Sequence, residues 1–414
     1  MHFCPVRFER RRASWKGGAT VLLVGLLLAT SGQAQTLSQA LAQAWARDPR
    51  AAALPAHEAE AQARAEVAAG LTPAPPSVAL SSLSDRFNAN QGQQEWELEL
   101  AVPLWLRGQR AARALEADRT LADVSARRAA LRLQVAGELR EVWWQLALAR
   151  QALDLATRRD AAAAALAADV SRRYQAGELA RLDANLAQNE RLAAQGELLE
   201  ARAALRQAEQ AYRGLTGAEA PAELAAETLA AHPDLSPVPV HPQLAAAQAA
   251  TEVAQARLGV AQQTRRDAPE LALRLVRERG DFSAPYASAF GIKLTVPFSG
   301  GAKLRQETAA AQADASQAEA ELALTRQRLE QAVAQARLTL ETAQLQMAQA
   351  QARRALTADS LHLAEKSFAL GESDLSTLLR ARASALEADA FLHRQVVAQA
   401  ASVSRLNQNL GVLP

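Results

Sequence analysis

The sequence of this chain repeats itself, and this repeat constrains the fold more than any other feature. Short motifs of the first half return in the second half roughly 194 residues later. The recurring pairs are Val102-Pro103 and Val296-Pro297, Tyr174 and Phe368, Gly177-Glu178 and Gly371-Glu372, and Gly217 and Gly411. A constant spacing over nearly the whole chain indicates two copies of one structural unit. We predict a first repeat over 35–217, a linker over 218–240 and a second repeat over 241–414.

Both repeats contain the same predicted elements in the same order. An Ala-rich helix is followed by two short strands, a very long helix, a glycine turn and a return helix. In the first repeat the helix covers 37–70, the strands 77–83 and 96–102, and the long helix 104–174. In the second repeat the corresponding ranges are 241–266, 270–276, 289–296 and 300–368. Gly177 and Gly371 are the predicted turn tips, and the proline-rich linker is predicted to be extended.

The long helices carry the pattern of a coiled coil. Apolar residues of the first one follow each other at heptad spacing, at Leu121, Val124, Leu131, Val135, Val142, Leu146 and Leu153. No proline interrupts either helix. About 70 residues form a rod of ~105 Å, whereas helices of soluble domains average about 11–12 residues. Such a rod is long enough to cross much of a periplasm.

The strands have a different pattern. In 96–102 and 290–296, large apolar residues alternate with polar or small ones. This alternation is typical of a membrane β-barrel, whose strands face lipid on one side and a polar interior on the other. A small soluble antiparallel sheet with its apolar face packed inward is the alternative interpretation. Aromatic residues near the strand ends are candidates for the membrane interface: Trp96, Trp105, Phe282, Tyr286 and Phe298.

Four strands cannot close a barrel by themselves. An open sheet edge in lipid leaves backbone groups without hydrogen bonds, which is strongly unfavourable. If these strands cross a membrane, several copies of the chain have to share one barrel. The predicted fold class is therefore mainly α-helical with a small transmembrane β part, assembled as an oligomer.

Residues 1–34 have the composition of a secretory signal peptide. A basic stretch with Arg10, Arg11, Arg12 and Lys16 precedes an apolar run over 21–29, and small residues follow it. A transmembrane helix is the alternative, but this run is too short for ~30 Å of hydrocarbon. Cys4, the one cysteine, lies in this segment, so the exported chain is predicted to have no disulfide, no cysteine metal site and no lipid anchor.

Net charge argues against a nucleic-acid partner. The formal charge of the whole chain is +2, but residues 1–34 carry five basic residues and one acidic residue. The exported chain is therefore slightly acidic, and its arginines alternate with acidic residues along helices. Nucleic-acid binding needs clustered positive charge, so the sequence predicts solvated helix faces instead.

The motifs together resemble the TolC family of outer-membrane efflux proteins over residues 36–414. Each repeat has a strand hairpin ending in Val-Pro, a very long helix, and Tyr174 or Phe368 three positions before the turn glycine. The stretches LRLQVAGELREVWWQLALAR (131–150) and SRRYQAGELARLDANLAQ (171–188) are similar to the CzcC-like heavy-metal branch. The resemblance implies a homotrimer with a twelve-stranded barrel in the outer membrane and a helical tunnel in the periplasm. It also implies a periplasmic adaptor and an inner-membrane pump, of RND type, as partners.

Family members narrow their tunnel with acidic residues near the second glycine turn, and this sequence departs from that pattern. The positions of the usual aspartates hold Thr377 and Arg380. Asp183 falls at the matching position of the first repeat, and the other candidates for the aperture are Glu178, Glu372 and Asp374. Carboxylates facing a narrow pore favour cations. The alternative is that they cap the return helices, since acidic groups stabilise a helix N-terminus.

No catalytic or nucleotide-binding motif occurs in the sequence, so neither an enzyme nor a cofactor is predicted. Asp359, His362 and Glu365 share a helix face, but a metal site needs ligands from a facing helix as well. The sequence therefore predicts an outer-membrane exit channel of a tripartite efflux system, with a periplasmic coiled-coil adaptor or scaffold as the alternative. Metal ions, solvents, drugs and polypeptides all remain open as cargo.

Overall fold

The computed structural model describes residues 36–230, 241–298 and 301–414, which belong to one unit, Ala34–Pro414. The predicted signal peptide over 1–34, the end of the predicted linker over 231–240, and position 300 lie outside the described residues. The fold is mainly α-helical with one four-stranded antiparallel sheet. The coarse fold class predicted from the sequence is thereby confirmed.

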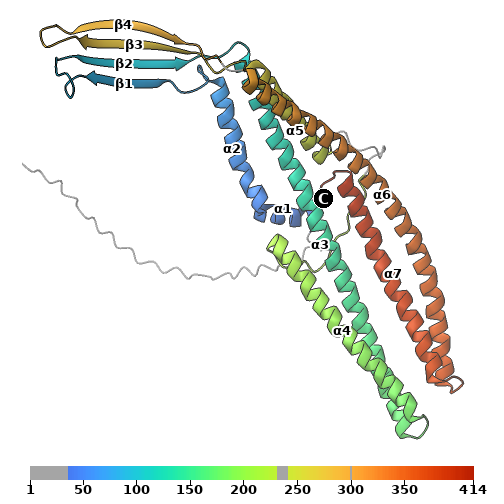
Figure 1. The fold of residues 1–414 in the computed structure, drawn as a ribbon. Helices are drawn as coiled ribbons and strands as arrows, with labels where there is room; N and C mark the ends of the chain where they lie inside the picture. Colours follow the sequence, from blue (N-terminus) through green and yellow to red (C-terminus); the bar gives the residue numbers. More distant parts are fainter. Residues whose placement is uncertain (1–35, 231–240, 299–300) are drawn as a thin grey trace, which may run out of the picture. The chain divides into compact units, whose positions relative to one another are not determined.

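The described elements follow in nearly the same order in both halves (Figure 1). The first half contains α1 (Leu37–Arg47), α2 (Pro49–Ala69), β1 (Ser77–Ser84), β2 (Gln94–Pro103), α3 (Gln109–Gln175) and α4 (Arg181–Thr216). The second half contains α5 (Pro242–Gln263), β3 (Glu270–Arg279), β4 (Ala287–Thr295), α6 (Gly301–Ala369) and α7 (Leu375–Asn409).

Most element boundaries lie within three residues of the sequence prediction, and two differences are larger. The single helix predicted over 37–70 is broken at Asp48, because the Asp48 carboxylate caps α2 by accepting from the amides of Arg50 (2.7 Å) and Ala51 (3.3 Å). Pro49 then occupies the first position of α2, where its missing N–H costs nothing. The long helix predicted from 104 begins only at Gln109. Before it, the Leu104 amide donates to the Pro269 carbonyl (2.7 Å), and a turn at 107–108 leads into the helix.

The sheet has the strand order β1-β2-β3-β4, and all neighbours are antiparallel. The central pair joins the two halves of the chain, with Leu98 opposite Leu275 and Ala101 opposite Ala272. Within the described chain, β1 and β4 each have one neighbour only. The sheet therefore has two open edges, one contributed by each half of the chain.

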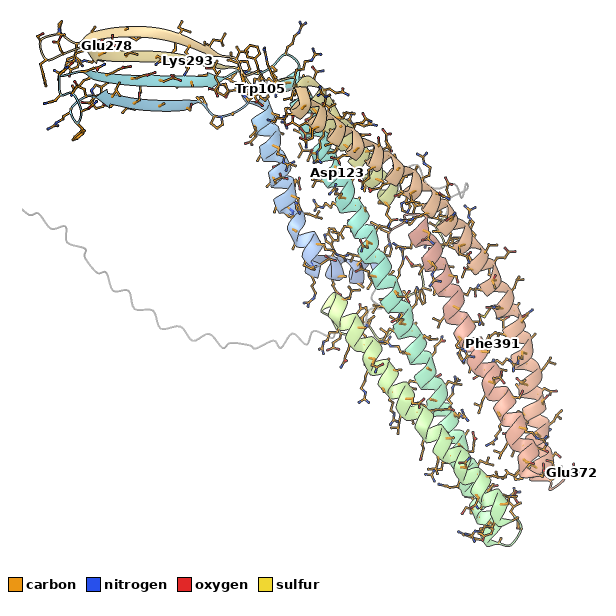
Figure 2. All side chains as sticks on the ribbon, in the orientation of Figure 1. Trp105, Asp123, Glu278, Lys293, Glu372 and Phe391 are labelled. Carbon is orange, nitrogen blue, oxygen red and sulfur yellow. The ribbon has the colours of Figure 1, made fainter. Side chains whose placement is uncertain are left out.

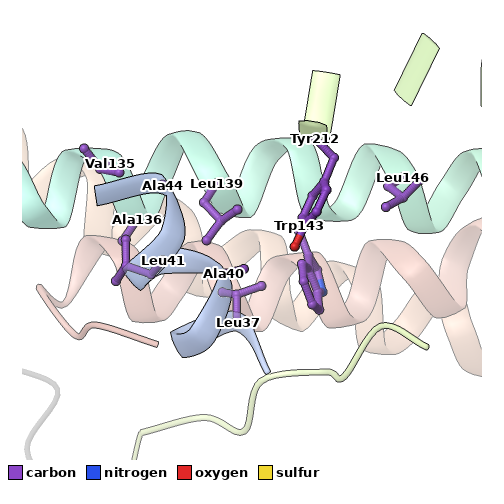
Figure 3. Packing of buried hydrophobic residues seen from close by; sticks show 10 residues of the cluster. All are labelled: Leu37, Ala40, Leu41, Ala44, Val135, Ala136, Leu139, Trp143, Leu146 and Tyr212. Carbon is purple, nitrogen blue, oxygen red and sulfur yellow. The ribbon is translucent and has the colours of Figure 1, made fainter. Parts of the chain in front are cut away.

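The largest core cluster lies where α1 packs between α3 and α4 (Figure 3). Leu41 of α1, Leu139 and Trp143 of α3, and Tyr212 of α4 are all buried there. The Trp143 and Tyr212 rings lie 6.2 Å apart at an interplanar angle of 52°, a tilted arrangement that aromatic pairs favour. The seven heptad positions predicted on α3 are all buried or half-buried. Packing of these seven residues against neighbouring helices stabilises the long helix along its length.

The described part of the linker is bound to both halves of the chain. Arg140 of α3 is buried and forms a bidentate ion pair with Glu227 of the linker (2.7 and 2.9 Å). The same guanidinium donates to Gln408 of α7 and to the Val412 carbonyl (3.0 Å). We call this set of residues the Arg140 clamp. It ties the first repeat, the linker and the chain's C-terminal end together at one point.

Candidate functional site

One face of the sheet is apolar and exposed. Along each strand alternate residues point to this face, and in register they form continuous rows, such as Leu80, Leu98, Leu275 and Phe290. Phe290 is 89% exposed and Ile292 77% exposed. The remaining exposed members are Val78, Trp96, Leu100, Leu271, Leu273 and Leu294. An apolar surface this continuous is rare on a protein surrounded by water and indicates a lipid or protein neighbour.

The opposite face of the sheet is polar and carries an ion-pair network across three strands. Arg274 of β3 pairs with Glu97 of β2 and lies 3.5 Å from Glu99. Lys293 of β4, labelled in Figure 2, lies 3.3 Å from Glu99. Small residues such as Ala79 and Gly291 fill the positions around them. Polar residues on one face and apolar residues on the other match a strand between lipid and a watery interior.

Three of the five predicted interface aromatics gather at the loop end of the sheet. The Tyr286 hydroxyl donates to the Gln94 side chain (2.6 Å). The guanidinium of Arg277 lies 4.8 Å from the Tyr286 ring centroid. Arg279 lies 5.5 Å from the Phe282 ring centroid. Trp96 stands on the apolar face of the same end and is 48% exposed. Aromatic rings beside cationic side chains are typical of a membrane–water boundary.

The other two aromatics lie at the end of the sheet where the helices begin. Phe298 follows β4 and is 93% exposed. Trp105 is half-buried, and its indole N–H donates to the Gly70 carbonyl at the end of α2 (3.2 Å). Trp105 therefore fixes the α2–α3 junction, whereas Phe298 has the exposure that an interface residue needs.

The predicted turn tips lie at the far ends of α3 and α6 from the sheet. Gly177 and Gly371 have φ values of +82° and +75°, which disfavour any residue with a Cβ. At both turns an amide reaches back to the last helical turn, from Glu178 to the Arg173 carbonyl and from Glu372 to the Ser367 carbonyl (both 2.9 Å). The glycine turns are thus built alike in the two repeats.

The two turns pack against each other through a small apolar cluster. Val170 of α3, Phe368 of α6 and Leu378 of α7 are buried in it. The guanidinium of Arg173 lies 5.3 Å from the Phe368 ring centroid. Because the cluster joins both hairpins, the four candidate carboxylates of the two turns belong to one end of the protein.

Two of these four carboxylates cap helices. Asp374 accepts from the Thr377 amide (2.9 Å) and the Ser376 hydroxyl (2.7 Å) at the start of α7. Hydrogen bonds from Thr377 and Ser376 lower the pKa of Asp374 to about 2. Asp183 accepts from the Ala180 amide (3.1 Å) at the start of α4. The capping interpretation offered by the sequence therefore describes what these two side chains contact.

The other two carboxylates are differently placed. Glu178 and Glu372 are exposed, and within the described chain their side chains make neither an ion pair nor a hydrogen bond. Figure 2 shows Glu372 at the turn between α6 and α7. Among the four candidates, these two are the ones whose charge is free to face a pore.

The described residues hold no group of three or more His, Cys, Asp or Glu side chains arranged to bind a metal ion. Glu365, one of the three residues sharing a helix face, pairs instead with Arg382 (3.0 Å). Among the helices of the described ranges, none combines the length and the apolar character that crossing a membrane requires.

Sequence and fold comparisons bear on both repeats. Residues 240–412 match the sequence model of a family described as outer membrane efflux protein. The second repeat is therefore similar to this family over nearly its whole length. Members of this family are transport channels of the outer membrane with periplasmic helical tunnels, and they are not enzymes. The match agrees with the family resemblance predicted from the sequence and with the outer-membrane location that it implies, whereas the heavy-metal branch stays a prediction.

Solved structures of outer-membrane channels share the fold. The outer membrane protein VceC from Vibrio cholerae superposes with a TM-score of 0.75 at 18% identity, covering 91% of this chain and 96% of VceC. The outer membrane channel CmeC from Campylobacter jejuni gives 0.74 at 15% identity, covering 91% and 85%. CusC, a transmembrane channel, gives 0.77 at 16% identity, covering 91% and 92%. No curated protein sequence matches the chain.

One structural feature was not anticipated from the sequence. The Arg140 clamp joins Arg140 to Glu227, which lies 87 positions later in the chain, and to Gln408, which lies 268 positions later. Arg140 stands between Leu139 and Glu141 and has an ordinary charged neighbourhood in sequence. The one available signal was its place among buried positions of α3, because an arginine there needs a partner.

Proposed function

We propose that this protein is the outer-membrane exit channel of a tripartite efflux system. Three copies share one twelve-stranded barrel and one periplasmic helical tunnel, formed by the repeats over 35–217 and 241–414. An inner-membrane pump, of RND type, supplies the energy, and a periplasmic adaptor connects pump and channel. The channel conducts cargo passively, and heavy-metal cations are one such cargo.

The sheet carries this proposal. Its apolar face is exposed, its polar face holds the Arg274 ion-pair network, and its outer strands β1 and β4 each have an open edge. In lipid, backbone groups at an open edge cost several kcal/mol each, roughly, unless they are paired. Pairing β4 of one copy with β1 of the next is antiparallel and continues the alternation. Repeating this step closes a barrel with the polar face inside.

The turns supply the proposed periplasmic aperture. Glu178 and Glu372 project unpaired charge there, while Asp183 and Asp374 hold the ends of α4 and α7 in place. In a trimer the two glutamates give a ring of negative charge around a narrow opening. Such a ring raises the local concentration of cations and lowers that of anions. This supports cationic cargo without strong chelation, which would hold the cargo back.

The proposal is tested by the conductance of the purified protein in a planar bilayer, together with its mass in detergent. We expect a trimer with stable channels that prefer cations. Replacing Glu178→Gln and Glu372→Gln together lowers this preference, because it removes the charge at the aperture. Glu66→Gln, an exposed glutamate of α2 near the sheet, is the matched control and leaves the preference unchanged. A monomer without conductance would favour the adaptor or scaffold alternative.

A further inference from the structure

A hollow rich in arginine lies where the sheet meets the helices. The β2–α3 and α5–β3 connections leave the sheet side by side, joined by the Leu104 to Pro269 hydrogen bond (2.7 Å) and by Gln109 to Thr264 (3.3 Å). Between them is a hollow of about 660 Å³, lined by Leu106, Arg107, Gly108, Gln263, Arg265 and Arg266. Three of its six lining residues are therefore arginines, and they come from two separate segments.

The three arginines of the hollow share one electrostatic property. Arg107, Arg265 and Arg266 are exposed, and no carboxylate of the described ranges forms an ion pair with them. The acidic residue that follows them, Asp267, lies 3.6 Å from Lys303. Arg119, by contrast, pairs with Glu252 at 2.7 Å. Like charges gathered around one hollow repel each other, and an anion placed between them removes that repulsion.

The surroundings of the hollow restrict which anion fits. The apolar rows of the sheet end at the pair Val102 and Leu271, four and five residues along the chain from the lining residues Leu106 and Arg266. Leu104 and Phe298, which follow β2 and β4, are also exposed. If the sheet spans the outer membrane as proposed above, this boundary lies at the periplasmic leaflet. A molecule with an anionic head and apolar chains matches both the arginines and the leucines beside them.

We infer that the hollow binds the phosphate of an anionic phospholipid of the periplasmic leaflet, with Arg107, Arg265 and Arg266 as its ligands. A guanidinium presents a planar fork of donors that matches phosphate oxygens better than an ammonium does. The acyl chains then lie along the apolar face, beside Leu104 and Leu271. Because both connections contribute arginines, the lipid also ties β2–α3 to α5–β3 and fixes how the sheet is seated on the helices.

Lipid binding by the purified protein in detergent tests the inference. Native mass spectrometry compares retention of phosphatidylglycerol with that of phosphatidylcholine carrying the same chains. The variant with Arg107→Gln, Arg265→Gln and Arg266→Gln should bind phosphatidylglycerol at least about tenfold more weakly, since it lacks the attraction between three guanidinium groups and the anionic lipid. Arg132→Gln, Arg326→Gln and Arg328→Gln together form the matched control, because these exposed helix arginines lie away from the hollow.

The outcomes separate this inference from the channel function on which it rests. Phosphatidylglycerol preference that disappears only in the first variant supports the inference, and glycerol phosphate, which has no chains, should not compete. A wild type that conducts ions but holds both lipids equally overturns the inference and leaves the channel intact. A wild type that neither conducts nor prefers phosphatidylglycerol overturns both. Circular dichroism and the mass in detergent check that each variant is folded and assembled.

Discussion

The helical core around α1 and the four-stranded sheet use apolar and charged residues in opposite ways. In the core, Trp143 and Leu139 are buried, and the charge of Arg140 is matched by Glu227. In the sheet, Phe290 and Ile292 are 89% and 77% exposed although both side chains are apolar. The core therefore buries its apolar side chains within one chain, while in the described part of the chain the sheet leaves its apolar face exposed and both of its edges unpaired.

This difference shows that one chain is folded for two solvents. Burial of apolar side chains stabilises the core in water. The same force opposes an exposed apolar sheet in water, and lipid removes that opposition. A short two-faced sheet is also weak on its own, since its edges remain open. The core should consequently stay folded in an isolated monomer, whereas the sheet should need the membrane and the neighbouring copies to stay folded.

The largest expected effect comes from breaking the Arg140 clamp. Arg140→Met removes the cation and leaves the Glu227 carboxylate largely buried and unpaired. Breaking a buried pair in this way typically costs about 3–5 kcal/mol. We expect a clearly lower thermal unfolding midpoint and faster protease cleavage within 218–230.

Two variants control for this experiment. Arg132→Met changes an exposed arginine of the same helix and should have little effect. Arg140→Met combined with Glu227→Gln should recover part of the loss, because the uncompensated charge is gone. If Arg140→Met unfolds at the wild-type temperature, the core does not depend on the clamp.

A charge on the apolar face of the sheet should have a smaller effect, and it should lower the yield of protein folded in lipid. Leu273→Arg places a cation in the middle of β3, where a lipid-facing arginine costs about 2–4 kcal/mol near the membrane centre. We expect a lower yield of folded protein in phospholipid vesicles. Ser81→Arg places the same charge on the polar face of β1 and should insert nearly as well as wild type. Equal yields for both variants would contradict the assignment of the two faces.

Local patterns in the sequence predicted the elements on which this comparison depends. Heptad spacing on α3 and alternation in β2 and β4 are short-range signals, so the long helices and the strands could be placed to within a few residues. The break at Asp48 was missed because a single Asp-Pro pair outweighed the helical tendency of its neighbours. The clamp was missed because its partners meet only through the tertiary fold. For the turns, the sequence supplied four carboxylates, but only the structure separates capping Asp374 from unpaired Glu372.

The smallest expected effect concerns the cap at the start of α7, and it tests whether the turns behave like the core or like the sheet. Asp374→Ala removes the acceptor of the Thr377 amide, so exchange of that amide with solvent should accelerate while the unfolding midpoint changes little. The folded-state pKa of Asp374, about 2, lies below its ordinary value of 3.8. The stabilisation is therefore complete above about pH 4 and disappears as the pH falls toward 2. Over that interval the protection of the Thr377 amide, its exchange rate relative to the intrinsic rate at the same pH, should fall in wild type and stay constant in Asp374→Ala. Glu372→Ala, two residues away and without a side-chain partner in the described chain, should exchange like wild type. A wild-type rate at Thr377 in Asp374→Ala would mean that packing of Leu375 and Leu378 alone holds this end of α7.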